Sequence, residues 1–165
     1  MKTKTTITEI SHEDLVELLS TATYGSNWLG IRRKVGDYKG TDLESGDDCL
    51  EDTWAKILLA GKYVYAYDFY AEDEEDFYGK LPHTWKEEEN AMRYEVTMEN
   101  IKRGLQKCLD GTFKSAYTEK ENIARERAYM RKCAMSFIEY EDGDFDITQA
   151  ETLMQVILFG EEIYG

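Results

Sequence analysis

Three aspartates near the C-terminus are the first residues whose spacing suggests chemistry. Asp142, Asp144 and Asp146 follow the D-x-D-x-D start of a calcium-binding loop. An EF-hand loop also needs Gly at its sixth position and Glu at its twelfth, where this sequence has Ile147 and Leu153. The sequence therefore favours a solvated turn before a helix, and a divalent metal bound by the three aspartates is the alternative.

The other patterns that would carry catalysis are missing from the sequence. His12 and His83 form no H-x-x-x-H pair, and neither G-x-S-x-G nor a glycine-rich phosphate loop occurs. Cys49, Cys108 and Cys133 show no CxxC spacing, and the last two fall among apolar helical positions, which is typical of inert, reduced thiols. The sequence therefore predicts a protein that is not an enzyme and needs no cofactor.

Acidic and aromatic side chains are closely interleaved in the middle of the chain. Carboxylates on a rigid surface imitate the potential of a phosphate backbone, and aromatic rings between them add hydrophobic contact. The residues predicted on this basis to bind a partner are Asp68, Tyr70, Glu72, Asp73, Glu74, Glu75, Asp76, Tyr78, Glu87, Glu88 and Glu89. The alternative is that the rings pack inward from a strand while the acids only face water.

Charge is arranged in blocks along the chain. There are 20 Lys and Arg residues against 34 Asp and Glu residues, which gives a net charge of −14. Segment 67–99 has 11 acidic and 3 basic side chains, whereas segment 100–133 has 9 basic and 4 acidic ones. Nucleic acids and anionic membranes attract proteins of the opposite charge, so we expect neither as a direct partner. The expected partner is a basic, nucleic-acid-binding protein, and a homo-oligomer that pairs acidic with basic blocks is the alternative.

Length and composition are those of one folded domain. The chain has 165 residues, of which 42% are hydrophobic, enough for a core in a single domain spanning 1–165. No apolar run approaches the roughly 18 residues that a membrane span needs. The first residues, MKTKTTITEISHEDL, lack the apolar region of a signal peptide. These features predict a cytoplasmic protein.

Five helices and a small sheet are expected from the periodicity of the apolar residues. Helix starts are predicted at Ser11, at Asp47 or Asp48, at Thr97 and at Thr148, and a longer helical pattern covers 119–139. The predicted fold class is α+β, with about five helices packed on a mainly antiparallel sheet of two to four strands.

The clearest predicted strand covers residues 62–70. Its alternation places Tyr63, Tyr65, Tyr67 and Phe69 on one face and Val64, Ala66 and Asp68 on the other.

Three segments together resemble a group of known sequences. They are TATYGSNW at 21–28, TMENIKRGL at 97–105 and DITQAETLMQVILFGEEIYG at 146–165. They are similar to segments of small acidic proteins carried by phages and mobile elements. The resemblance implies a bacterial cytoplasm and no specific activity. By analogy with phage accessory proteins, the hypothesis is a non-enzymatic inhibitor of a host defence protein, such as a CRISPR or restriction effector, that acts through a DNA-mimicking acidic surface.

Overall fold

The structure consists of helices packed with one antiparallel sheet, which confirms the α+β prediction. The computed structural model describes residues 6–33, 50–139 and 145–164. The elements are α1 (His12–Gly25), β1 (Leu29–Arg32), α2 (Leu50–Leu59), β2 (Tyr63–Asp68), β3 (His83–Lys86), β4 (Ala91–Thr97), α3 (Met98–Asp110), α4 (Lys120–Ile138) and α5 (Ile147–Phe159).

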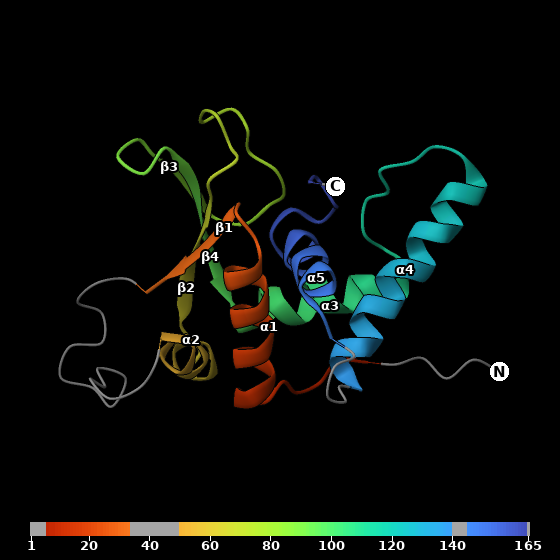
Figure 1. Cartoon of the computed structure of the whole chain (residues 1–165), viewed down its shortest axis with the longest axis horizontal. Helices are drawn as coiled ribbons and strands as arrows, with labels where there is room; N and C mark the ends of the chain where they lie inside the picture. The colour runs from red at the N-terminus through yellow and green to blue at the C-terminus, as the bar shows by residue number, and fades with distance from the viewer. Residues whose placement is uncertain (1–5, 34–49, 140–144, 165) are drawn as a thin grey trace.

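The four strands form one sheet in the order β1-β2-β4-β3, with every neighbouring pair antiparallel. Figure 1 shows the sheet at one side of the molecule and α4 at the other, with α1, α3 and α5 between them. Within the described ranges, no helix is both long enough and apolar enough to cross a membrane. The fold is therefore a sheet with helices packed on it and one further helix outside them.

Two helix starts lie where the sequence predicts them. The Ser11 side chain accepts a hydrogen bond from the Asp14 amide at 3.1 Å, and the Asp14 carboxylate accepts one from the Ser11 amide. Thr97 and Asn100 exchange the same pair of bonds at the start of α3. Both capping predictions are confirmed, because each motif satisfies amides that a helix leaves unpaired at its N-terminus.

The predicted start of the last helix is wrong by two residues. The cap is Asp146, whose carboxylate accepts from the Gln149 amide at 2.8 Å, while Gln149 accepts from the Asp146 amide. Thr148 lies inside the first turn, because Asp146, two residues earlier, forms the capping box with Gln149. The predicted caps Asp47 and Asp48 lie outside the described residues.

The four strands fall within the predicted two to four, but two of them lie in segments that were not assigned to strands. The central strand is confirmed as β2, but His83, expected in a loop, begins β3. The segment before α3, which was not assigned to a strand, forms β4 and pairs with both β2 and β3. In β4 the apolar residues Met92, Tyr94 and Val96 alternate with polar ones, so this strand could have been predicted from the sequence. β3 lies at the edge of the sheet and has only partly buried or exposed residues, so its sequence gives little signal.

Helix α5 is the centre of the core. Ten of its 13 residues are buried, and it packs against α1, α3 and α4. Its contact with α3 is made at Gly104, where a Cβ atom would lie 2.6 Å from the Cα atom of Ile157. Glycine inside a helix costs about 1 kcal/mol relative to alanine, so its presence here marks an approach of two backbones that a side chain would prevent.

The change Gly104→Ala should lower the free energy of unfolding by about 1–3 kcal/mol, because the added methyl group meets backbone that cannot move aside. The matched variant is Gly25→Ala, whose methyl group meets only the side chain of the half-exposed Ile147. Urea unfolding of the two variants measures the difference. A smaller loss for Gly104→Ala than for Gly25→Ala would contradict the packing described here.

Candidate functional site

Most of the predicted partner-binding residues lie at one end of the sheet. They occupy the loop between β2 and β3 and the turn between β3 and β4, which project from the same end in Figure 1. We call the exposed carboxylates of these two segments the acidic end; they are Glu72, Asp73, Glu74, Glu75, Glu87 and Glu88. Within the described part of the chain, none of the six forms an ion pair. No cation among the described residues therefore neutralises their charges.

Two aromatic side chains fasten the β2–β3 loop to the body of the protein. The Phe77 ring stacks on His83 with 3.4 Å between ring centroids, and the Tyr78 ring packs edge-on against Phe159 at 5.9 Å. Ala71 and Leu81, at the two ends of the loop, are buried. The aromatic residues of this segment thus serve partly as anchors, as the alternative interpretation of the sequence expected.

Two aspartates hold the loop in shape from within. The Asp76 carboxylate accepts a hydrogen bond from the Glu72 amide at 2.8 Å, and the Asp73 carboxylate accepts one from the Glu75 amide at 2.9 Å. Such bonds from aspartate to nearby backbone amides are typical of tight turns. Asp76 is half-buried, whereas Glu72, Glu74 and Glu75 are exposed to solvent.

Asp68 is not part of the acidic surface, and its prediction as a binding residue is corrected. Its side chain is fully buried, because the face of β2 that it shares with Val64 packs on the helices. It accepts hydrogen bonds from the Tyr164 hydroxyl at 2.6 Å and from the Tyr70 amide at 3.0 Å. Burial raises the pKa of this carboxyl, while those hydrogen bonds oppose the rise. Asp68 therefore joins the C-terminal segment to the sheet.

The C-terminal segment that carries Tyr164 is fixed by one buried glutamine. The Gln155 side chain accepts from the Ile163 amide at 2.8 Å and from the Tyr164 amide at 2.6 Å, and it donates to the Tyr164 carbonyl at 2.9 Å. These bonds, together with the bond from Tyr164 to Asp68, hold Ile163 and Tyr164 between α5 and β2.

The remaining predicted binding residues differ in exposure. Tyr70 is 51% exposed beside the acidic end and can contact a partner, whereas Tyr78 is half-buried as an anchor. Glu89 forms an ion pair with Arg32 at 2.9 Å, so its charge is partly neutralised. Five glutamates are exposed and form no ion pair with any described residue: Glu72, Glu74, Glu75, Glu87 and Glu88.

The alternative chemistries gain no support from the geometry. Asp142 and Asp144 lie outside the described residues, and Asp146 is engaged as the cap of α5. No group of three or more metal-ligating side chains occurs among the residues that are described. Burial raises the pKa of Cys108 to about 12 and that of Cys133 to about 11, so both thiols stay protonated at neutral pH.

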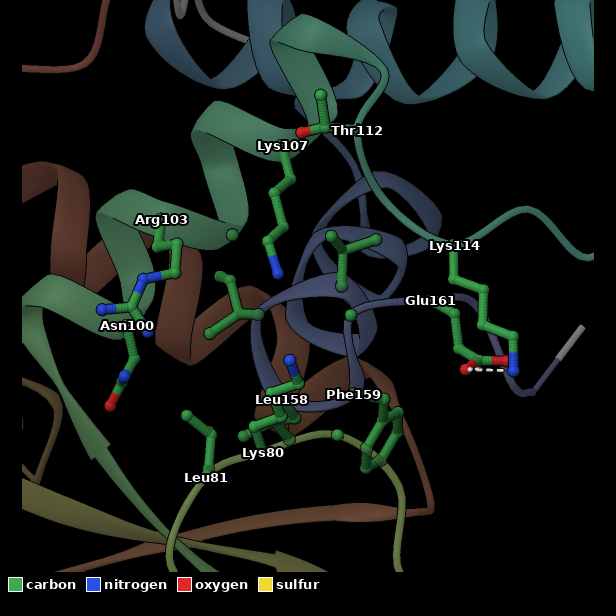
Figure 2. Close-up of a pocket in the computed structure, with 15 residues that line it drawn as sticks. Lys80, Leu81, Asn100, Arg103, Lys107, Thr112, Lys114, Leu158, Phe159 and Glu161 are labelled. Carbon is green, nitrogen blue, oxygen red and sulfur yellow. Dashed lines mark ion pairs between the residues drawn. The ribbon is translucent and has the colours of Figure 1, made fainter.

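A basic pocket next to the acidic loop is a feature that the sequence did not predict. It is a cavity of about 620 Å³ between the α3 face, the C-terminal end of α5 and the backbone at Gly79. Figure 2 shows Lys107 pointing from α3 into the hollow, with Lys80 on the opposite side near Phe159. Arg103 lies at one side of the pocket and Lys114 at the other. The excess of basic residues in segment 100–133 is the one sequence signal that could have pointed to this pocket.

Asp68→Asn should change how stability depends on pH. The pKa of Asp68 is higher in the folded protein than in the unfolded chain, where it is near 4. The contribution of Asp68 to the free energy of unfolding is therefore complete below about pH 4 and is lost as the pH rises through the folded-state pKa. Asparagine cannot titrate, so the stability advantage of the wild type over Asp68→Asn should shrink with rising pH. Urea unfolding from pH 4 upward measures it, and a difference that is the same at every pH would contradict the assignment.

Tyr164→Phe provides a second test of the same contact. The substitution removes a hydrogen bond that stabilises the Asp68 carboxylate, so the pKa of Asp68 should rise further. The fall in the free energy of unfolding with rising pH should therefore continue to a higher pH than in the wild type.

The chain matches no protein-family model, no curated protein and no solved structure. The charges, contacts and burial of the described residues are thus what a functional proposal has to rest on.

Proposed function

We propose that this chain is a non-enzymatic binding protein whose acidic end docks into the basic groove of a nucleic-acid-binding protein. The observation that carries the proposal is the set of five exposed glutamates at one end of the sheet, none paired with a cation in the described part of the chain. A groove that binds phosphates with Lys and Arg is complementary to such a surface, because electrostatic complementarity selects partners and speeds association.

The shape of the loop supports docking over simple solubility. Phe77 and Tyr78 anchor the loop, and Asp73 and Asp76 brace it, so the glutamates are presented on an ordered segment. An ordered surface loses little conformational entropy on binding. Tyr70, more than half exposed at the edge of this surface, supplies the aromatic contact that interfaces favour. The resemblance to acidic phage proteins makes a CRISPR or restriction effector of the bacterial host the first partner to test.

A competition experiment tests the proposal. A purified CRISPR effector and a purified restriction endonuclease, each holding a fluorescent DNA duplex, are titrated with the chain. Displacement of the duplex should weaken steeply with added salt, because exposed charges are screened within about 8 Å at physiological ionic strength. Changing Glu72, Glu74, Glu75, Glu87 and Glu88 to Gln should weaken displacement at least about fivefold, since each exposed ion pair contributes roughly 0.2–1 kcal/mol.

The matched control removes the same charge elsewhere. Changing the exposed Glu9, Glu13, Glu99, Glu121 and Glu139 to Gln also brings the formal net charge from −14 to −9. This variant should displace the duplex nearly as well as the wild type does. Equal weakening in both variants would show that net charge alone acts. Salt-sensitive self-association in light scattering, without displacement of DNA, would favour the homo-oligomer instead.

A further inference from the structure

The basic pocket carries more positive charge than the carboxylate in its walls balances. Its walls contain Lys80, Arg103, Lys107 and Lys114 against one carboxylate, Glu161, which leaves a formal charge of +3. Lys114 pairs with Glu161 at 3.4 Å. The other three cations make no ion pair and no side-chain hydrogen bond with any residue that the structure describes. Three cations without a described ion-pair partner in one pocket are unexpected in a chain with a net charge of −14.

The end of helix α5 explains only a part of this gathering. Helix α5 ends at Phe159 in the pocket wall, and the C-terminus of a helix carries roughly half a negative charge. Half a charge does not balance a formal charge of +3. The side-chain donors of Lys80, Arg103 and Lys107, three on an ammonium group and five on a guanidinium group, have no acceptor among the described residues. The pocket is therefore suited to an anion that accepts several hydrogen bonds.

The dimensions of the pocket indicate a small molecule. A volume of about 620 Å³ lies within the range of roughly 300–1,000 Å³ that is typical of small-molecule sites. Leu81, Leu158 and Phe159 supply apolar lining on the side where Lys80 lies. A ligand with an anionic group and an apolar or flat part would use both kinds of wall.

A long polyanion is disfavoured by the neighbouring loop. Gly79 and Lys80, which line the pocket, follow directly after the β2–β3 loop and its exposed carboxylates. A nucleic-acid strand extending from the pocket over this loop would meet like charge. A small anion that fits within the pocket does not extend over this loop.

We propose that this pocket binds a small organic phosphate, whose phosphate groups contact Lys80, Arg103 and Lys107. Phosphate is the anion that fits these groups best, because it carries up to two charges and because the guanidinium fork of Arg matches the geometry of its oxygens. The proposal goes beyond the docking function of the acidic end, since it uses different residues and a different class of ligand.

Calorimetric titration tests the proposal with inorganic pyrophosphate and ATP as probes, at about 0.05 M salt, where charge interactions extend furthest. Both probes should bind, with a dissociation constant below about 10 mM. Arg103→Ala and Lys107→Ala should each weaken binding at least about tenfold, because hydrogen bonds to charged groups are the strong ones. Lys120→Ala and Lys132→Ala, which remove exposed cations from α4, are the matched controls and should change affinity less than about twofold.

The outcomes separate this proposal from the docking function. Absence of binding at about 10 mM of either probe, or equal weakening by the α4 controls, would overturn the phosphate site. Binding of a DNA oligonucleotide as tightly as ATP would overturn the restriction to small anions. The five-glutamate variant retains every pocket cation, so phosphate binding survives in that variant even if the docking function is wrong.

Discussion

Both charged surfaces depend on the packing of one aromatic ring, that of Phe159 at the end of α5. The ring is buried, and its centroid lies 5.6 Å from the rings of Trp28 and Tyr94, 5.9 Å from that of Tyr78 and 6.0 Å from that of Tyr164. These neighbours come from the residue before β1, from β4, from the β2–β3 loop and from the C-terminal segment. The same residue lines the basic pocket. One ring thus connects the sheet, the acidic loop and the pocket wall, because each of them packs against it.

The anchored loop keeps negative and positive charge apart over a short stretch of chain. Its first half presents Glu72, Glu74 and Glu75 to solvent, and its second half turns inward at Phe77. After that turn the chain reaches Lys80 at the pocket. A flexible loop would let these opposite charges pair with each other, which would weaken both surfaces. The aromatic anchoring is therefore what allows a strongly acidic chain to keep a separate cationic hollow.

The sequence predicts the elements better than it predicts the sites. Helix caps and apolar periodicity are local, so most helices and the central strand could be found. The alternation along β2 had already placed Asp68 on the same face as Val64 and Ala66, and that face is the core; the burial of Asp68 could have been inferred from this pattern. The pocket could not be predicted, because Lys80 belongs to the acidic segment and meets α3 only after folding. Gly104, inside a helix, was the one local sign that α3 is closely approached.

The central claim is that the acidic end is an ordered surface held by the aromatic cluster around Phe159. The order parameters of the backbone amides of residues 72–76, obtained from nitrogen-15 relaxation, test this claim most directly. The account predicts values near those of rigid backbone, about 0.85, and a clear fall when Phe159→Leu removes the ring that Tyr78 packs against. Values below about 0.6 in the unaltered protein would contradict it, because a loop that moves so freely cannot present its carboxylates as a fixed array.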